Sequence, residues 1–250
     1  MNIIKSLTQT TYSILCRAWF WLLDALYPKR CLGCGSLDYW CCPACYAGLT
    51  FGRELKCPGC SLPSQLGAWC ANCSAGHNLN GLWVAQPYGN PLVRNMIKAW
   101  KYDGLKELAQ PLLNLLLAAL KTYSLPPAWH AVARANWQLV PVPLARRRRL
   151  ARNFNQAEVL AQGIASALNL KINPLLERQR RTKPQSELRD QERLTNLKGA
   201  FKLKDGSQAK DEIFILVDDI YTSGATLEEC ALVLKQAGAA EVWGLVIAQG

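Results

Sequence analysis

The chain is poor in histidine, the side chain that most often serves as an acid–base catalyst and as a metal ligand. It has only two histidines, His77 and His130, in 250 residues, and neither belongs to a recognisable motif. This scarcity argues against histidine-based catalysis and against a histidine-rich metal site. The sequence also holds neither G-x-x-x-x-G-K-[ST] nor G-x-G-x-x-G, which excludes the two commonest loops that bind nucleotide phosphates.

Acidic residues are scarce relative to basic ones. The chain has 18 Asp and Glu against 29 Lys and Arg, which gives a net charge of +11. Residues 134–210 alone carry 17 basic and 6 acidic side chains, so this one region accounts for the whole excess. A regional excess of positive charge favours a phosphate-rich partner, either a nucleic acid or a polyphosphate substrate. A solvated basic surface is the alternative.

No hydrophobic run is long enough to span a bilayer. Residues 1–28 are rich in apolar side chains but are interrupted by Arg17 and Asp24, whereas a spanning helix needs about 20 consecutive apolar residues. No small-residue cleavage site of a signal peptide follows them. We therefore expect an amphipathic helical lead-in that packs on the rest of a cytoplasmic protein. Peripheral membrane contact through Trp19 and Trp21 stays open.

Cysteine, by contrast, is abundant, with eleven residues. Eight of them form four C-x-x-C pairs between residues 29 and 80, a segment with little periodicity. Two thiolates three residues apart hold one side of a tetrahedral Zn²⁺, so four pairs predict two closed, structural sites with four cysteine ligands each. In a segment too small for its own core, zinc contributes folding energy. The pattern resembles a double zinc ribbon with the ligands Cys31, Cys34, Cys42, Cys45, Cys57, Cys60, Cys70 and Cys73.

Two details of this cysteine module stay open. Pairing in chain order gives one site from the first four ligands and a second from the last four, but an interleaved cross-brace satisfies the same spacing. Cys41 competes with Cys42, which we prefer because it completes a C-x-x-C pair. Cys16 and Cys230 lie on apolar helical faces and are expected in the core.

From Gly81 onward the hydrophobic pattern alternates between strands and helices, which predicts an α/β domain over residues 81–250. Its strongest element is the run at 213–217, which is continuously apolar and rich in β-branched residues, as in a strand buried on both faces of a parallel sheet. The other expected elements are strands at 82–88, 138–143 and 241–248, helices at 91–100, 104–123 and 227–237, and a basic turn followed by a helix within 144–161.

Two adjacent acids follow the strand at 213–217. Asp218 and Asp219 are costly to bury unless paired, so we expect them at the strand's carboxyl end, where open α/β sheets bind ligands. A small-residue loop and then a helix come next, and loop N–H groups together with a helix N-terminus form an anion site. Gly224 permits a positive φ or a close approach of the backbone. This order of elements predicts a site for a sugar phosphate.

The run Val217–Thr226 resembles the phosphoribosyl-pyrophosphate (PRPP) motif of type I phosphoribosyltransferases. The resemblance implies a phosphoribosyltransferase-like parallel sheet flanked by helices, preceded by the N-terminal zinc-ribbon module. It implies PRPP together with Mg²⁺ as ligands, with Asp218 and Asp219 at the ribose hydroxyls. It assigns the 5′-phosphate to the loop that consists of Thr222, Ser223, Gly224, Ala225 and Thr226.

A longer likeness, which begins at Cys31 and covers nearly the whole chain, is to the ComF family of competence proteins. It rests on Pro141–Leu144, Arg152–Gln156, Arg178–Leu188 and Arg193–Phe201, and on Lys101–Gly104, which resembles the family's segment ahead of the core. The resemblance implies a role in natural transformation or in the use of external DNA. It also implies single-stranded DNA as a partner, together with competence helicases or DNA-processing proteins.

The ComF likeness assigns chemistry to the connection that follows the strand at 138–143. In phosphoribosyltransferases this connection holds pyrophosphate, a role that suits Arg152 as a bidentate donor and places it in the catalytic set with the two acids. Asn153 stands where the family usually has Gly, and Asn tolerates left-handed backbone better than most residues. The polar segment around Pro184 fits a lid that closes over the site.

Two classes of function stay open. The first is a PRPP-binding phosphoribosyltransferase that acts on an acceptor not named by the sequence. The second is a non-catalytic protein that binds single-stranded DNA with the same fold, through a basic groove and aromatic stacking. The candidate residues for the second class are Arg146, Arg147, Arg148 and Arg149. Trp100, Trp129 and Trp137 are among nine tryptophans that could offer stacking platforms, but most of the nine are expected in the core.

Overall fold

The computed structural model describes residues 28–51, 54–123, 137–179 and 197–250. The chain forms two compact units, Met1–Leu49 and Thr50–Gly250, so the second group of cysteines shares a unit with the domain that follows it. The predicted domain limits, 1–28, 29–80 and 81–250, stay a prediction. The lead-in helix expected at the N-terminus falls outside the described part of the chain.

The described part of the first unit is a short hairpin followed by one helical turn. An antiparallel bridge closes the hairpin, and the N–H of Cys31 donates to the carbonyl of Ser36 at 2.8 Å. Helix α2 (Pro43–Ala47) then begins at Cys42, whose thiol accepts from the N–H of Cys45. Both C-x-x-C pairs of this unit therefore lie at turns that expose backbone N–H groups to sulfur.

The second unit opens with a hairpin of the same kind. The N–H of Cys57 donates to the carbonyl of Leu62 at 2.8 Å, and an antiparallel bridge again joins the two flanks. A 3₁₀ turn, η1 (Gln65–Gly67), leads to a bridge between Ala68 and Gly81 at the start of the sheet. The two cysteine groups thus share their local structure although they belong to different units.

A five-stranded sheet forms the core of the second unit, in the order β1–β7–β6–β2–β3, with every neighbouring pair parallel. In β6, the residues Phe214–Val217 are fully buried, because elements cover both faces of the sheet. The predicted α/β class, with a parallel sheet flanked by helices and a cysteine-rich ribbon region, is confirmed. The strands are β1 (Gly81–Pro87), β2 (Trp137–Pro141), β3 (Lys171–Ile172), β6 (Ile213–Tyr221) and β7 (Glu241–Gln249).

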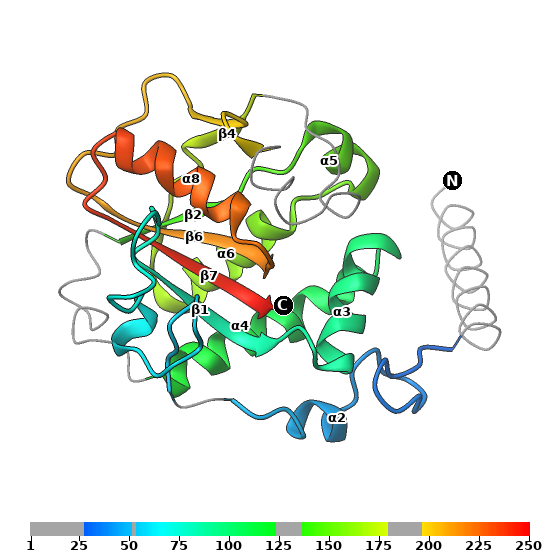
Figure 1. The fold of residues 1–250 in the computed structure, drawn as a ribbon. Coiled ribbons are helices and arrows are strands. Elements are labelled where there is room, and N and C mark those ends of the chain that lie inside the picture. The colour runs from blue at the N-terminus through cyan, green and yellow to red at the C-terminus, as the bar shows by residue number, and fades with distance from the viewer. Residues whose placement is uncertain (1–27, 52–53, 124–136, 180–196) are drawn as a thin grey trace, which may run out of the picture. The chain divides into compact units, whose positions relative to one another are not determined.

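Helices cover the two faces of this sheet (Figure 1). Helices α4 and α6 pack against β1, β2 and β6 on one face, while α8 packs against β6 and β7 on the other, beside the antiparallel pair of β4 and β5. Helix α3 begins at Asn90, whose side chain accepts from two N–H groups of the first turn. The bounds are α3 (Pro91–Tyr102), η2 (Lys106–Leu108), α4 (Ala109–Thr122), α6 (Gln156–Leu168), β4 (Leu176–Arg178), β5 (Phe201–Leu203) and α8 (Ala225–Gln236).

Two elements differ from the sequence prediction. A helix, α5 (Arg146–Arg152), occupies the segment where the sequence predicts a basic turn, and it ends at Asn153, which has φ 61° and ψ 3°. This Asn adopts the left-handed conformation that glycine usually takes at such a position. Strand β6 continues to Tyr221, beyond its predicted end at Val217, because it stays in register with β7 as far as Gln249.

The described tryptophans nearest the sheet belong to the core. The rings of Trp83 and Trp243 stack with centroids 5.1 Å apart, and Trp137 stacks on Trp83 at 6.0 Å. Trp100 is 1% exposed and Trp137 is 5% exposed. These two rings are therefore core residues, as the sequence predicts for most tryptophans, and they offer no stacking platform to DNA because a base cannot reach a buried ring. The third candidate, Trp129, lies outside the described residues.

Gly81 allows the second cysteine-containing segment, residues 54–80 (the second ribbon below), to approach the sheet closely. A Cβ atom at this position would lie 2.6 Å from Cζ3 of Trp243 and would also collide with the carbonyl oxygen of Gly67. Because that backbone cannot move cheaply, we expect Gly81→Ala to lower the free energy of unfolding by about 1–3 kcal/mol, as measured by urea denaturation. Gly89→Ala is the control, since nothing lies within 4 Å of a Cβ there. Equal effects of the two substitutions would contradict the close packing.

Candidate functional site

Two carboxylates lie side by side near the end of β6. Asp219 is 7% exposed, and Oδ1 of Asp218 accepts from the N–H of Asp219 at 2.8 Å. Burial, and then the charge of Asp219, raise the pKa of Asp218 to about 7, while Lys101 and Arg152 act in the opposite direction. Two carboxyls so placed favour a ligand that brings hydroxyl donors or cationic charge.

Lys101 forms an ion pair with one of these acids. Its Nζ lies 2.7 Å from Oδ1 of Asp219, and the two side chains are 14% and 10% exposed. Lys101 stands in the last turn of α3, where the helix dipole favours a cation. A buried ion pair seldom stabilises a fold better than apolar contacts would. We therefore interpret this pair as a feature of the site and not as a device for stability.

The segment Thr222–Thr226, which runs from the end of β6 into the first two residues of α8, is called the anion loop below. Gly224 caps α8 with φ 75°, and a Cβ atom at this position would collide with the hydroxyl of Tyr221, so only glycine fits. Helix α8, 12 residues long, begins within this segment at Ala225, and its macrodipole places positive potential at the loop. The loop thus has the geometry of a phosphate cradle.

A second wall comes from the connection between β2 and α6. Asn155 caps α6 by accepting from the N–H of Ala157, and its Nδ2 donates to the carbonyl of Val142 at 3.0 Å. Gln156 is 2% exposed, and its Oε1 accepts from Nη1 of Arg152 at 3.2 Å. Among the described residues, Nε2 of Gln156 has no hydrogen-bond partner. A buried amide donor of this kind favours a ligand oxygen opposite it.

The two walls enclose a cavity of about 600 Å³. The acids Asp218 and Asp219, the whole anion loop, Arg152 and Gln156 line it. The structure therefore brings together every residue that the sequence assigns to catalysis or to PRPP, although they come from two separate connections of the sheet.

The four arginines proposed to bind DNA face different surroundings. Arg148 is half-buried and lines the cavity, whereas Arg146, Arg147 and Arg149 are exposed on α5 and are not among its lining residues. Nη2 of Arg149 also pairs with a carboxylate oxygen of Glu158 at 3.1 Å. Of the four, only Arg146 and Arg147 are thus exposed and without an ion pair to another described residue.

Sequence reasoning did not assign four further residues that line the cavity: Tyr88, Lys101, Tyr102 and Arg178. For Lys101 and Tyr102 the available signal is a likeness of the Lys101–Gly104 segment to the ComF family, which carries no role. Arg178 stands at the end of β4, in a segment that the sequence marks only as the start of a lid. The guanidinium of Arg152 lies 5.2 Å from the ring centroid of Tyr102.

Positive charge outweighs negative charge around the cavity. Lys101, Arg148, Arg152 and Arg178 line it together with the two acids. Burial lowers the pKa of Arg178, and the nearby charge of Arg148 lowers it further, as expected where cations are crowded in a poorly solvated place. Such crowding suits a ligand with several negative charges.

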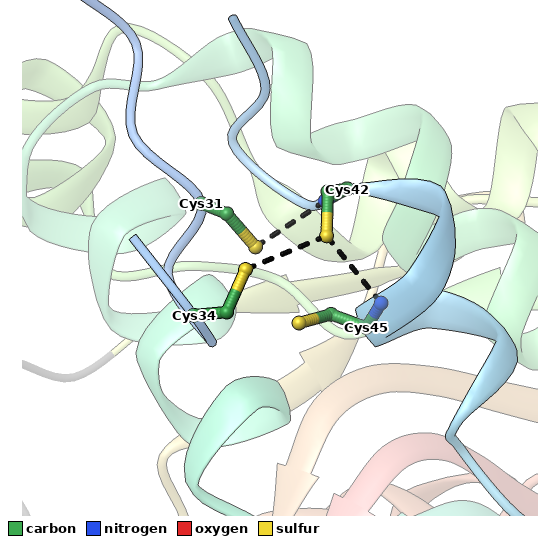
Figure 2. Close-up of side chains that lie close together, drawn as sticks. All are labelled: Cys31, Cys34, Cys42 and Cys45. Atoms are coloured by element: carbon green, nitrogen blue, oxygen red, sulfur yellow. Dashed lines mark hydrogen bonds between the residues drawn. The ribbon is translucent and has the colours of Figure 1, made fainter. Parts of the chain in front are cut away.

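The eight predicted zinc ligands form two groups, and in each group the four sulfur atoms lie within 4.8 Å of one another. Figure 2 shows the four thiols of the first group pointing toward a common centre. The cysteines group in chain order and not as a cross-brace, and Cys42 joins the first group in place of Cys41. The groups are Cys31, Cys34, Cys42 and Cys45, and Cys57, Cys60, Cys70 and Cys73.

The electrostatics of both groups suit a metal that binds thiolates. Burial opposes ionisation of Cys31, but backbone N–H groups, that of Cys34 foremost, outweigh it and lower its pKa to about 6. Cys57 has a pKa of about 6 for the same reasons. Hydrogen bonds within each group, with Cys34 and Cys70 foremost, instead raise the pKa of Cys45 and of Cys73 to about 12, so these two thiols hold protons that a metal ion displaces. Since Zn²⁺ takes thiolate ligands in tetrahedral sets of four, the two groups fit zinc.

Among the described residues, no helix combines the length and the apolar character needed to cross a bilayer. Cys230 is fully buried in the core, as the sequence predicts, and Cys16 lies outside the described residues.

Comparison with known proteins finds one domain match and several relatives. The double zinc ribbon domain matches residues 22–74. Competence protein F of Haemophilus influenzae is 28% identical over 235 residues, which cover 82% of this chain and 95% of that protein. Competence protein ComFC of Streptococcus pneumoniae is 29% identical over 204 residues, covering 77% of this chain and 81% of that protein.

DNA utilization protein YhgH of Escherichia coli K12 is 31% identical over 220 residues, which cover 84% of this chain and 92% of that protein. The likeness to all three relatives spans most of each chain. On this identity and coverage, the chain belongs to the ComF family.

Proposed function

We propose that this protein binds PRPP together with Mg²⁺ and serves DNA uptake or the use of external DNA. The observation that carries the proposal is the cavity that unites the acid pair, the anion loop and the arginine-lined wall. PRPP presents ribose hydroxyls, a 5′-phosphate and a pyrophosphate. The acid pair, the anion loop and the arginine-lined wall match these three groups in that order. The names of the relatives, competence protein and DNA utilization protein, support the cellular role.

The acid pair and the anion loop would bind different parts of the ribose phosphate. Asp218 and Asp219 accept hydrogen bonds from the ribose hydroxyls, which suits carboxyls on the strand end. The 5′-phosphate takes the anion loop, where the N-terminus of α8 and the backbone that Gly224 allows favour an anion. Carboxylate oxygens are ligands that Mg²⁺ prefers, so the pair fits the metal, which when bound neutralises charge on the pyrophosphate.

The opposite wall suits the pyrophosphate. Arg152 and Arg148 offer planar, permanently charged donors, and Nε2 of Gln156 adds a buried donor beside them. Transfer of the phosphoribosyl group would leave concentrated negative charge on pyrophosphate, and fixed cations in a poorly solvated cavity stabilise such charge as it develops. The protein's contribution is therefore electrostatic and positional. The acceptor of the transfer is not part of this proposal.

Lys101 would respond directly to the ligand. In the structure its Nζ neutralises Asp219 at 2.7 Å. Ribose hydroxyls and a metal-bound ligand compete for that same carboxylate, so Lys101 is released toward the negative charge that the ligand brings. The ion pair thus keeps the acid satisfied until the ligand replaces it.

Ligand-dependent stability tests the binding. PRPP with Mg²⁺ at a hundredfold excess over its dissociation constant should add about 2.7 kcal/mol to the free energy of unfolding, and Asp219→Asn should abolish this gain because it removes a charged acceptor. Thermal unfolding with and without ligand measures both. Asp205→Asn, which neutralises an exposed carboxyl, should behave like the parent. Absence of any ligand-dependent shift in the parent removes the proposal.

We also infer that each cysteine group holds one structural zinc ion. The match of the double zinc ribbon domain to residues 22–74 and the sulfur geometry of both groups support this inference. With four protein ligands each, neither ion has an open position for substrate, so the metal stabilises the fold and performs no chemistry.

Metal analysis of the purified protein should find two zinc ions per chain. Cys31→Ser and Cys57→Ser should each reduce the content to one, because each removes a ligand from a different group. Cys41→Ser should keep two, since this thiol lies outside the first group. A parent protein with one zinc ion would show that one group does not bind the metal.

Single-stranded DNA binding is a second candidate function. Its support is α5, where Arg146 and Arg147 are exposed on the helix whose Arg148 and Arg152 line the cavity. Leu150 on the same helix is 71% exposed and Tyr102 at the cavity is 69% exposed. A basic surface with apolar and aromatic contacts is typical of proteins that follow a single strand.

Salt dependence tests this second candidate. If both arginines contact phosphates, replacing Arg146 and Arg147 by Gln should reduce the slope of log affinity against log salt by about 1.4, because each single-strand contact contributes about 0.7. Fluorescence anisotropy with a labelled oligonucleotide measures the slope. Lys121→Gln, an exposed cation on α4, is the control. An affinity indifferent to salt in the parent contradicts a phosphate-tracking surface.

A further inference from the structure

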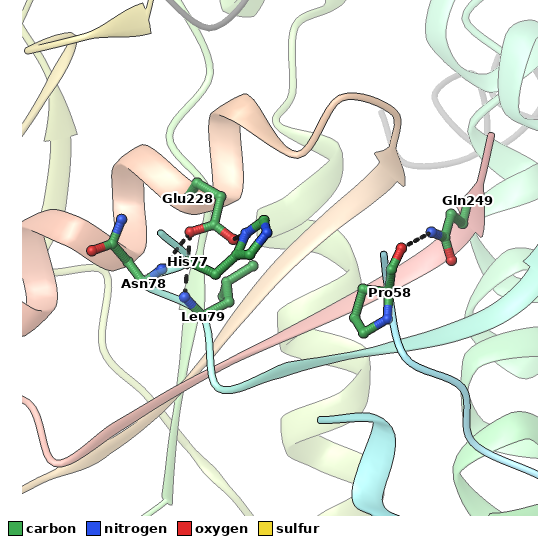
Figure 3. A network of polar contacts seen from close by, with 6 residues as sticks. All are labelled: Pro58, His77, Asn78, Leu79, Glu228 and Gln249. Carbon is green, nitrogen blue, oxygen red and sulfur yellow. Dashed lines mark hydrogen bonds and ion pairs between the residues drawn. The ribbon is translucent and has the colours of Figure 1, made fainter. Parts of the chain in front are cut away.

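The second ribbon, residues 54–80, contacts α8 and also β7, the sheet neighbour of the strand β6 that precedes the anion loop. One contact reaches the first turns of α8, which begins within the loop. The other reaches the end of β7, which runs beside the end of β6 where the loop begins. Figure 3 shows the two contacts.

The first contact centres on the carboxylate of Glu228. Its Oε2 accepts from the N–H of Asn78 at 2.6 Å and from the N–H of Leu79 at 3.4 Å. Its Oε1 lies 2.8 Å from Nδ1 of His77. The side chain of Glu228 is only 15% exposed, and hydrogen bonds to a charged, poorly solvated acceptor are among the stronger ones in a protein.

The second contact joins Gln249 to Pro58. Nε2 of Gln249 donates to the carbonyl of Pro58 at 3.2 Å, and Pro58 stands inside the Cys57–Cys60 pair. Gln249 is the register partner of Tyr221, the last residue of β6. The carbonyl of Tyr221 accepts from the N–H of Gly250 at 3.0 Å. The ribbon is thereby attached at the point from which the loop departs.

The second cysteine group lies between these two contacts. Pro58 belongs to the first pair of the group. The other contact is linked to the second pair through Trp69, which precedes Cys70 and stacks on His77 with centroids 3.4 Å apart and planes within 10°. A metal ion that joins the two pairs therefore fixes one contact relative to the other.

Glu228 is poorly placed for anion binding unless something neutralises it. It stands in the first turn of α8, where a carboxylate draws on the same positive helix end as a bound phosphate. Burial, and then the charge of Glu228, raise the pKa of Tyr221, which places this charge beside the residue that precedes the loop. The N–H groups of Asn78 and Leu79 in the ribbon donate to this carboxylate and offset its charge.

We propose that the second ribbon is a clamp on the anion loop, with Glu228 as a positioning residue, so that metal in the second cysteine group sets the affinity of the loop for phosphate. The first cysteine group belongs to the other compact unit and has no part in this clamp. The proposal rests on the proposed function for the identity of the ligand, but the rigidity of the loop can be measured without any ligand.

Amide hydrogen exchange in the ligand-free protein is the first arm. The N–H of residue 228 donates to the carbonyl of Gly224 at 2.9 Å, so it reports on the junction of loop and helix. Glu228→Ala and Cys57→Ser should each raise exchange in a peptide covering 224–230 at least tenfold. Cys31→Ser should leave that peptide unchanged. Unchanged exchange in Glu228→Ala overturns the clamp, even if Cys57→Ser fails to fold.

Affinity for PRPP with Mg²⁺ is the second arm. Glu228→Ala should weaken binding at least tenfold, while Glu228→Gln, which keeps an oxygen acceptor for Asn78 and Leu79, should restore most of it. Glu229→Ala is the matched control, because this neighbouring carboxylate accepts from the N–H of Gly199 and not from the ribbon. Equal or tighter binding by Glu228→Ala would mean that the charge acts only by repulsion, which contradicts the clamp.

The two arms separate the clamp from the proposed function. A parent that does not bind PRPP, together with raised exchange in Glu228→Ala, removes the proposed ligand but keeps the clamp. A parent that binds PRPP, together with unchanged exchange and affinity in Glu228→Ala, keeps the ligand and removes the clamp.

Discussion

The position of β6 between two parallel neighbours is the constraint on which the rest of the structure depends. Both faces of the sheet are covered, so the interior of the strand has to be apolar, and carboxylates fit only near its carboxyl end. Asp219 is still nearly buried there and needs Lys101 beside it. Since parallel strands end at one edge of a sheet, the connection that follows β2 arrives at the same place. The fold therefore assembles acids, cations and loop as one unit.

How much of this site can be predicted from sequence depends on how local each signal is. The acids and the anion loop are predictable because an apolar run, two carboxylates and small residues follow one another directly. The spacing predicts eight cysteine ligands in four pairs, but their division into two groups in chain order comes only from the structure. Lys101 lies 118 residues from Asp219, and no local pattern connects them. Tertiary packing alone brings Lys101 and Arg178 to the cavity, so sequence reasoning could not assign them.

One error of prediction has a physical cause as well. A run of arginines lacks apolar periodicity, which suggests a turn, but arginine has a high intrinsic helix propensity and α5 forms. Asn153 then ends that helix in the left-handed conformation, so the turn survives without the usual glycine. The sequence also supports the general expectation that most tryptophans are buried, but which of them are, such as Trp100 and Trp137, depends on how helices cover the sheet.

Leu79, near the end of the second ribbon, and its partner Glu228 on α8 lie 149 residues apart in the chain. Strand β1, which begins directly after the ribbon, likewise has β7 as its neighbour in the sheet. During synthesis on the ribosome, the ribbon and β1 emerge long before the helix and strand against which they pack. Binding of the proposed zinc ion would let the ribbon fold locally during that interval. The sheet, in contrast, cannot form around β1 until β7 has been synthesised.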